Sequence, residues 1–218
     1  MENTPAFDIS KVIEDARSII INPVDFYQKM SKTGGFIEPL IYVVVMAAIA
    51  AGIMFILSLI GGKPVGIGIL VILPIMMAVA SFISAGIIYL IWKIMGSGND
   101  YEAAYRCVAY SMAILPVSAL LSIVPFIGLI VPALWGAYLM ITASTEVHGL
   151  DKQKASMVFG ALALLSIFVN MSTQRAVNNM EDQLDKVGGL AESMKDMTPE
   201  EAGKALGEFQ RGFEEATK

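Results

Sequence analysis

Two long stretches with almost no charge limit what this chain can fold into more than any other feature. Between Glu38 and Trp92 only Glu38 itself and Lys63 are charged, and from Cys107 to Thr145 there is no charged residue. A soluble domain is usually about 25% charged and about 45–50% apolar, whereas this chain is 16% charged and 56% hydrophobic. Because the remaining charge collects near both ends of the chain, we expect its middle to lie in a membrane.

The apolar stretches divide into five segments that are long enough to cross a bilayer. At about 1.5 Å per residue, about 20 helical residues span a hydrocarbon core about 30 Å thick. Pro116 and Pro132 lie inside two of these segments and predict local kinks, and Pro125 with Gly128 predicts a very short turn. The expected fold class is all-α: a polytopic membrane helix bundle of about five transmembrane helices, with amphipathic N-terminal and helical C-terminal flanks. The predicted spans are residues 36–60, 66–91, 108–123, 126–142 and 155–171.

Two short helices are expected before the first span. Apolar residues recur at helical spacing along residues 9–21, which predicts an amphipathic helix that lies on the membrane surface or packs on the bundle. Asp8 or Ser10 is the expected cap of this helix, and Asn22–Pro23 is its expected end, because the residue before a proline avoids the helical region. A second short helix is expected within residues 25–32, and the glycine pair that follows ends it.

The connection between the second and third spans is expected to lie at the membrane surface. Residues 101–110 predict an interfacial helix, in which Glu102 and Arg106 stand four residues apart with opposite charge. Trp92 and Lys93 at the end of the second span are expected to be interfacial anchors. After the fourth span, glycine 149 is the expected helix stop and Asp151 the expected cap of the last span.

Basic residues are unevenly divided between the two ends of the predicted spans. Eight fall at one end and three at the other, and an excess of lysine and arginine marks the cytoplasmic side. The N-terminus is therefore expected in the cytoplasm, and five spans place the C-terminus outside. The eight are Lys11, Arg17, Lys29, Lys32, Lys93, Arg106, Lys152 and Lys154, and the three are Lys63, Arg175 and Lys186.

The C-terminal tail differs in composition from the rest of the chain. Residues 172–218 hold six basic and ten acidic residues. We expect a helix of about four turns, a break near Gly188–Gly189, and a second helix that opens at Thr198 with a proline at its first position. The apolar stripe of this second helix would pack on the first helix of the tail, on a partner or on a second copy. The stripe consists of Ala202, Leu206, Phe209 and Phe213.

No residue pattern points to catalysis, a cofactor or a metal. His148, the only histidine, stands near Glu146, which is too small a set for a metal site, and we interpret it as a structural loop residue. Cys107 is the only cysteine and is interpreted as a small apolar residue near the membrane interface. Glu38 lies at the edge of its span, as an interfacial carboxylate facing headgroups rather than a proton site. A net charge of −5 without a basic stripe argues against a nucleic-acid partner.

Three segments resemble a known family of membrane proteins. They are the loop EVHGLDKQKA at residues 146–155, the segment NPVDFY at residues 22–27, and the Tyr110-to-Pro116 stretch followed by IVPFIG at residues 123–128. Together they resemble the prokaryotic branch of the YIP family, the Ypt/Rab-interacting membrane proteins, over about residues 22–168. The resemblance implies five spans. The eukaryotic branch is associated with Rab GTPases, vesicle traffic and membrane shaping, but its aspartate-leucine-tyrosine-glycine-proline motif is absent here, so Rab binding is not implied.

These observations predict a three-part, non-enzymatic membrane protein. Residues 1–35 are expected to be a cytoplasmic amphipathic segment, residues 36–171 a five-span YIP-like domain in a prokaryotic plasma membrane, and residues 172–218 an acidic helical tail. Besides the bilayer, the expected partner is a membrane protein or a second copy, bound in a scaffolding or membrane-organising role. Two alternatives are an accessory subunit of a larger complex and an oligomeric permease or channel for ions or small solutes. The candidate pore-lining residues are Ser81, Ser84, Ser118 and Ser122.

Overall fold

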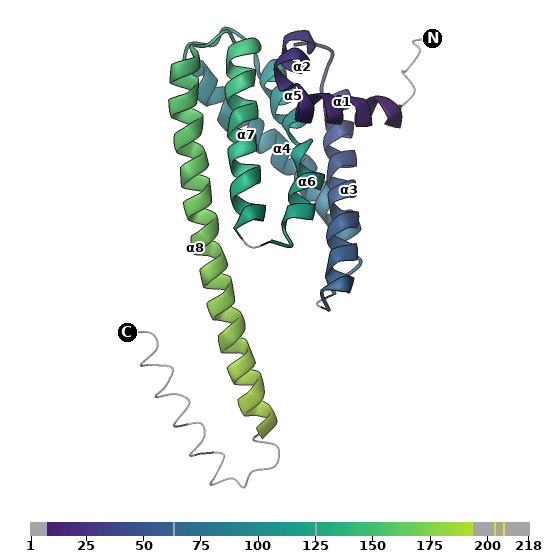
Figure 1. The fold of residues 1–218 in the computed structure, drawn as a ribbon, viewed down its shortest axis with the longest axis vertical. Coiled ribbons are helices and arrows are strands. Elements are labelled where there is room, and N and C mark those ends of the chain that lie inside the picture. The colour runs from purple at the N-terminus through teal and green to yellow at the C-terminus, as the bar shows by residue number, and fades with distance from the viewer. Residues whose placement is uncertain (1–7, 63, 125, 194–202, 204–206, 208–218) are drawn as a thin grey trace. The chain divides into compact units, whose positions relative to one another are not determined.

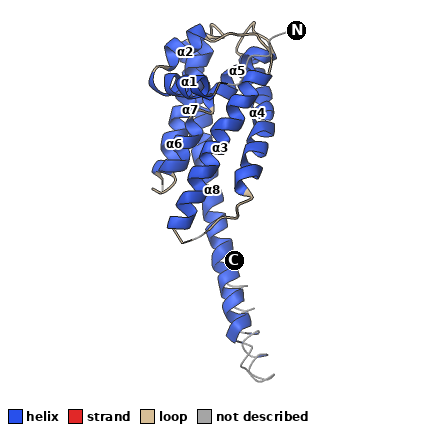
Figure 2. Ribbon diagram, turned by 90° about the vertical axis from the view of Figure 1, so that its right-hand side faces the viewer, coloured by secondary structure: helices blue, strands red, loops and turns tan. Residues whose placement is uncertain are grey.

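The computed structural model describes residues 8–62, 64–124, 126–193, 203 and 207, and these residues contain helices and no strands (Figure 1, Figure 2). The chain divides into two compact units, residues 1–167 and 168–218. The first unit holds α1 to α7 and the beginning of α8, and in the second unit α8 continues to Ser193. In chain order the helices are α1 (Ile9–Ile21), α2 (Pro23–Lys29), α3 (Ile37–Ile60), α4 (Ile69–Ile94), α5 (Tyr101–Ser111), α6 (Ile114–Leu121), α7 (Ile127–Glu146) and α8 (Lys152–Ser193).

Five helical stretches are long and apolar enough to cross a membrane, which confirms the predicted number of spans. Four of them agree with the sequence prediction to within a few residues at their starts. The third begins at Tyr101 rather than at residue 108, because α5 and α6 together form it. The protein is therefore a multi-pass membrane protein. The five stretches are Ile37–Ile60, Ile69–Ile94, Tyr101–Leu121, Ile127–Glu146 and Lys152–Arg175.

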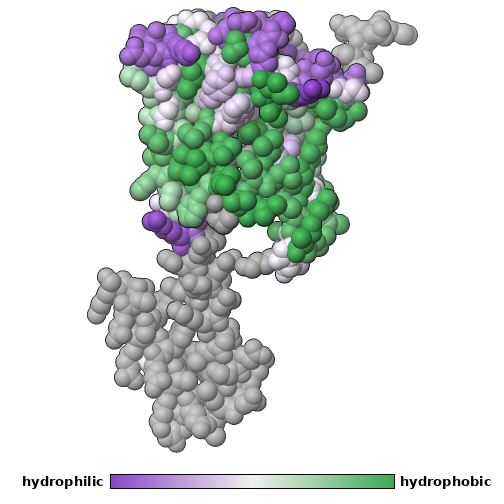
Figure 3. Space-filling model, in the orientation of Figure 1, coloured by the Kyte–Doolittle hydropathy of each residue, from purple (hydrophilic) through white to green (hydrophobic). Residues whose placement is uncertain are grey.

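A polar cap closes one end of the first unit. The cap consists of α1, α2 and the connection at residues 30–36, and α1 runs across α3 rather than along it (Figure 1). The loops between α4 and α5 and between α7 and α8 lie at this same end, since Asn99 of the first loop and Lys32 of the cap both donate to the Val147 carbonyl, at 2.8 and 2.7 Å. Hydrophilic side chains gather at this end, while a hydrophobic band covers the spans (Figure 3).

The predicted caps start α1 and α8, and α1 ends at Ile21 as predicted, but α2 ends at Lys29, before the glycine pair that was predicted to end it. Asp8 caps α1 by accepting a hydrogen bond from the amide two residues later, at 2.9 Å, and α2 begins directly at Pro23. Gly34–Gly35 follows α2 with φ angles of 125° and 84°, a left-handed region that favours glycine. Asp151 caps α8 by accepting from the amide three residues later, at 2.9 Å.

The short turn between α6 and α7 requires the glycine that the sequence places there. A Cβ atom at Gly128 would lie 2.6 Å from the backbone oxygen of Leu121 and 2.8 Å from the Cα of Ser122. Real Cβ contacts are not that short, so any larger residue would push the two helices apart. The close approach of α6 and α7 therefore depends on the missing side chain.

The prediction of an interfacial helix at residues 101–110 is wrong. Every residue from 103 to 110 in α5 is buried, and α5 packs against α3, α4 and α7. Three alanines in this stretch, Ala103, Ala104 and Ala109, let the neighbouring helices approach closely. The span then breaks at a two-residue turn between Ser111 and Ile114, just before the predicted kink at Pro116. The third span is thus the most buried of the five.

The tightly packed core lies toward the capped end. Trp92, predicted to be an interfacial anchor, is fully buried among protein side chains there, together with Tyr27 of α2 and Ile19 of α1. By contrast, Ile60, at the other end of α3, is 79% exposed. Lipid provides the apolar surroundings for such side chains. The cap therefore supplies the packing that a soluble domain would find in its interior, and the rest of each span faces the bilayer.

In the second unit the helix of the tail is longer than predicted. α8 continues through Gly188–Gly189 to Ser193, so the predicted break at this glycine pair is wrong. Glycine lowers helix stability by only about 1 kcal/mol relative to alanine, and neighbouring turns offset such a cost. The predicted start of the second tail helix at Thr198 lies outside the described residues.

Candidate functional site

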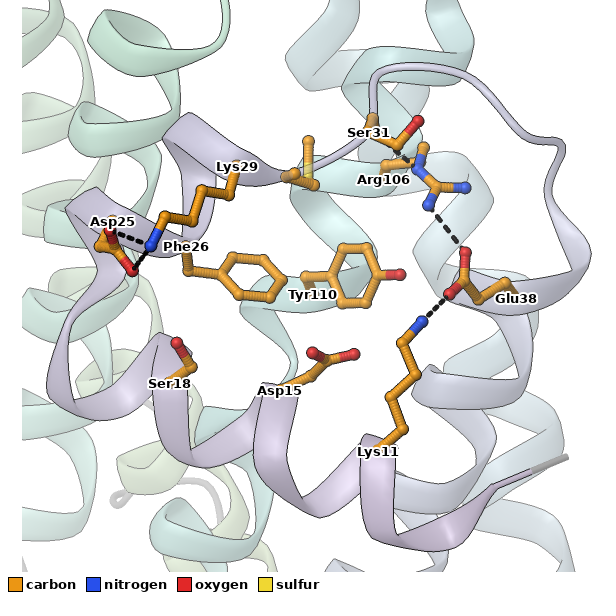
Figure 4. Close-up of a pocket in the computed structure, with 11 residues that line it drawn as sticks. Lys11, Asp15, Ser18, Asp25, Phe26, Lys29, Ser31, Glu38, Arg106 and Tyr110 are labelled. Carbon is orange, nitrogen blue, oxygen red and sulfur yellow. Dashed lines mark hydrogen bonds and ion pairs between the residues drawn. The ribbon is translucent and has the colours of Figure 1, made fainter.

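A polar pocket of about 340 Å³ lies between the cap and the spans, and it gathers charged side chains that are far apart in the sequence (Figure 4). Three of its lining residues are basic and three are acidic, so the pocket is close to electroneutral. Its walls come from α1, α2, the connection after α2, α3 and α5. The lining residues are Lys11, Asp15, Ser18, Asp25, Phe26, Lys29, Met30, Ser31, Glu38, Arg106 and Tyr110.

The Arg106 guanidinium is the most buried charged group of this site. Its side chain is only 4% exposed. It donates to the Ser31 carbonyl at 2.8 Å, to the Gly35 carbonyl at 3.1 Å and to the Glu38 carboxylate at 2.8 Å. A buried charge is tolerated only when it is paired and its N–H groups are satisfied. Arg106 therefore ties α5 to the cap and to the first turn of α3 at once.

Glu38 is shared by two cations. Besides Arg106 it forms an ion pair with Lys11 of α1, and its own side chain is 46% exposed. Hydrogen bonding to Glu38 raises the pKa of Lys11 above its ordinary value, which keeps the amine charged. The prediction that Glu38 faces lipid headgroups misses these contacts. Its carboxylate instead holds α1 against the mouth of the first span.

The other charges of the pocket are partly paired. Lys29 forms an ion pair with Asp25 at 2.7 Å, four residues earlier in α2. Asp15 of α1 makes no hydrogen bond or ion pair with the described residues, and burial raises the pKa of its carboxyl above the ordinary value. The cations of the pocket are thus engaged by its own acids. This arrangement fits a clamp between cap and spans better than a site for a charged ligand.

A second polar cluster surrounds His148, beside the pocket and under α2. The imidazole stacks on the Trp92 indole with 3.9 Å between ring centroids, and its Nδ1 lies 2.7 Å from the Ser97 hydroxyl oxygen. Its Nε2 lies 3.9 Å from Cys107 Sγ. The Trp92 N–H donates to Ser144 at 2.7 Å. Burial, with further contributions from Lys32 and Lys93, lowers the pKa of His148 to about 4, so the ring is neutral at physiological pH.

Helix α2 links the His148 cluster to the cap. The buried Tyr27 hydroxyl donates to the Cys107 carbonyl at 3.3 Å, and burial raises the pKa of Tyr27 well above its ordinary value. Gln28 donates to Glu146 at 2.7 Å. These contacts hold α2 against the middle of α5 and the end of α7. The cap is therefore attached at two places, at the Arg106 network and at the His148 cluster.

Residues singled out from the sequence thus meet, although not in the pairs that local spacing predicts. Glu38 meets Arg106, whereas the predicted Glu102–Arg106 contact does not form, since Glu102 accepts from the Gly35 amide at 2.6 Å. Sequence reasoning missed this network. The signal that could have revealed it is Arg106, because an arginine within an apolar span needs a partner. Among the described residues no group of three or more histidine, cysteine, aspartate or glutamate side chains could hold a metal ion, and the absence of catalytic and cofactor residues stays a prediction.

Replacing Glu38 with glutamine should loosen the cap. Glu38→Gln removes the one carboxylate among the described residues that pairs with the buried Arg106, so we expect the free energy of unfolding in mixed detergent micelles to fall by about 1–3 kcal/mol. Asp25→Asn is the matched control, because it breaks the exposed pair with Lys29, and such a pair contributes about 0–1 kcal/mol. Equal losses in the two variants would contradict the proposed clamp.

His148 should make the stability of the protein depend on pH. Its pKa is about 4 in the folded chain and about 6.5 in an unfolded chain. Between these values the unfolded chain binds a proton that the folded chain does not, so stability should fall as pH drops from about 6.5 to 4, by up to about 3 kcal/mol. His148→Gln cannot titrate and should flatten this part of the unfolding profile. Parallel profiles for wild type and variant would refute the assignment.

A comparison with protein families places the fold in a known group. The Yip1 domain matches residues 17–173, from α1 through the last candidate span. No curated protein and no solved structure matches the chain. The match contains all three segments on which the resemblance to the YIP family rests, and it includes the Arg106 network and the His148 cluster. As it covers well over half of the 218 residues, the chain belongs to the Yip1 family of membrane proteins.

Proposed function

We propose that this protein is a non-enzymatic scaffold that presents its capped end to a membrane-protein partner or to a second copy and organises the bilayer around it. The observation that supports this proposal is that the buried Arg106 and its three partners attach the cap to the spans. A binding surface is useful when its groups are held in place before the partner arrives. The clamp does this for α1, α2 and the two loops beside them.

The contents of the spans favour a scaffold over a permease or channel. A transport path usually carries ionisable groups at membrane depth. In the described part of the five candidate spans, every ionisable side chain except the tyrosines and Cys107 lies within the first or last two turns. The hydroxyls of Ser81, Ser118 and Ser122 donate to backbone carbonyls three or four residues earlier in their own helices, which leaves their helices without a free polar face at these positions.

The role of an accessory subunit in a larger complex is a variant of the same proposal. It differs only in the partner, and the surface involved is again the capped end. Exposed charges are available there on α2 and at the beginning of α8, where Lys152 and Lys154 are exposed. Charged side chains at the edge of a protein–protein interface mainly affect how fast and how selectively the partners associate. Both roles predict a retained partner and no solute flux, whereas a permease predicts flux.

We further propose that the capped end faces the cytoplasm of a prokaryotic cell. This proposal is supported by the distribution of the eight basic residues counted on the N-terminal side: seven lie in α1, in α2, in the connection after it, or at the ends of α4 and α8 nearest the cap, and Arg106 is buried in α5. Reporter fusions to Met1 and Lys218, with activity only inside or only outside the cell, should show the first end inside and the second outside. Both ends on one side would contradict the odd number of spans.

Purification in mild detergent should distinguish a scaffold from a permease. We expect the full chain to retain a stoichiometric membrane-protein partner or a second copy, identified by mass spectrometry, and to give no solute or ion flux in liposomes. Replacing Lys152 and Lys154 by glutamine should slow association with this partner several-fold at low salt, because it removes charges at the edge of the interface. The control is Arg175→Gln, at the opposite end of the same candidate span. Flux from the pure protein, with no retained partner, would sink the scaffold proposal.

A further inference from the structure

A groove beneath α1 lies on the side of the helix that faces away from the polar pocket. It has a volume of about 350 Å³, within the range of about 300–1,000 Å³ that is typical of ligand pockets. Its walls come from α1, α3, α6 and the turn before α6, and nine of its ten lining residues are apolar. The lining residues are Ile13, Ala16, Arg17, Ile20, Ile21, Met46, Ile49, Ala113, Pro116 and Val117.

The depth of α1 in the membrane puts this groove at the boundary between the headgroup region and the hydrocarbon core. Lys11 of α1 pairs with Glu38 in the first turn of α3, at the mouth of the first span. Three isoleucines of α1 stay exposed in the protein alone: Ile9, Ile13 and Ile21 are 47, 56 and 68% exposed. An amphipathic helix with such a face lies in the membrane interface with its apolar side in the acyl region. The groove under it is therefore filled by hydrocarbon rather than by water.

One charged group lines this otherwise apolar groove. Arg17 is exposed and forms no ion pair or hydrogen bond with the described residues, unlike Lys11, Lys29 and Arg106. A guanidinium is well suited to a phosphate, which it binds through two parallel hydrogen bonds. An apolar groove with a phosphate-binding group at its wall matches one class of molecule in the bilayer, the phospholipids.

We propose that the groove binds one diacyl phospholipid of the leaflet that contacts α1, with an acyl chain between α1, α3 and α6 and the headgroup phosphate on Arg17. The bound lipid fills the space that the cap leaves open on the membrane side and supports α1 from below. Recognition uses the phosphate, which is common to zwitterionic and anionic phospholipids. This inference depends on the membrane position of α1 and not on the scaffold role, so either proposal can fail while the other stands.

Native mass spectrometry of the full chain tests this lipid site. Delipidated protein in mild detergent is titrated with phosphatidylglycerol or phosphatidylcholine that carries palmitoyl and oleoyl chains. We expect one tightly retained lipid of either kind, an apparent affinity about tenfold weaker in Arg17→Gln, and an intermediate affinity in Arg17→Lys, which keeps the charge but loses the bidentate contact. Lys93→Gln is the matched control, since it removes an exposed positive charge from α4, outside the groove.

A second pair of variants tests the acyl chain. Val117→Trp fills the groove and should abolish the retained lipid, whereas Val79→Trp adds the same bulk to a position on α4 that is 55% exposed and outside the groove, and should leave it unchanged. Equal retention by all variants would show annular lipid only and overturn the proposal. So would a second copy of the chain that Val117→Trp displaces. If a variant does not fold, a spin-labelled phospholipid with wild-type protein in vesicles decides: the absence of an immobilised component refutes the site.

Discussion

The position of the Arg106 guanidinium is the constraint on which the rest of the structure depends. A charge that is 4% exposed within a candidate span is strongly unfavourable unless its N–H groups are matched. Its acceptors come from the connection after α2 and from the first turn of α3. These segments must therefore meet above α5. Together with the contacts of α2 near the His148 cluster, this arginine fixes the cap above the buried aromatic residues.

Different interactions stabilise the capped end and the remainder of the spans. Toward the capped end, Tyr27 and Trp92 are buried among protein side chains and hydrogen-bonded, as in a soluble core. Away from it, apolar side chains such as Ile60 are largely exposed in the isolated chain. Helix association in lipid has little hydrophobic driving force, so close packing and hydrogen bonds must supply it. The concentration of both at the capped end makes that end the rigid part of the first unit.

Local patterns in the sequence were sufficient for the spans but not for the contacts between them. Long uncharged runs predict the five membrane helices, and Asp8, Pro23 and Asp151 mark helix boundaries through local preferences. The network of Arg106 joins residues 68 to 75 positions apart. Spacing within one helix suggested Glu102 as the partner, and local spacing carries no signal for an acid on another helix. Trp92 was misplaced for the same reason, because its partner Ser144 lies 52 positions away.

The shared use of Glu38 connects the membrane surface to the cap. Its carboxylate binds Lys11 of α1 and the buried Arg106 at the same time. Lys11 belongs to α1, whose isoleucines Ile9, Ile13 and Ile21 are exposed, whereas Arg106 is buried in α5. Arg106 also fixes the Ser31 and Gly35 carbonyls of the cap. Two ion pairs that share one carboxylate therefore join α1, the first turn of α3 and α5 to the surface that we propose for partner binding.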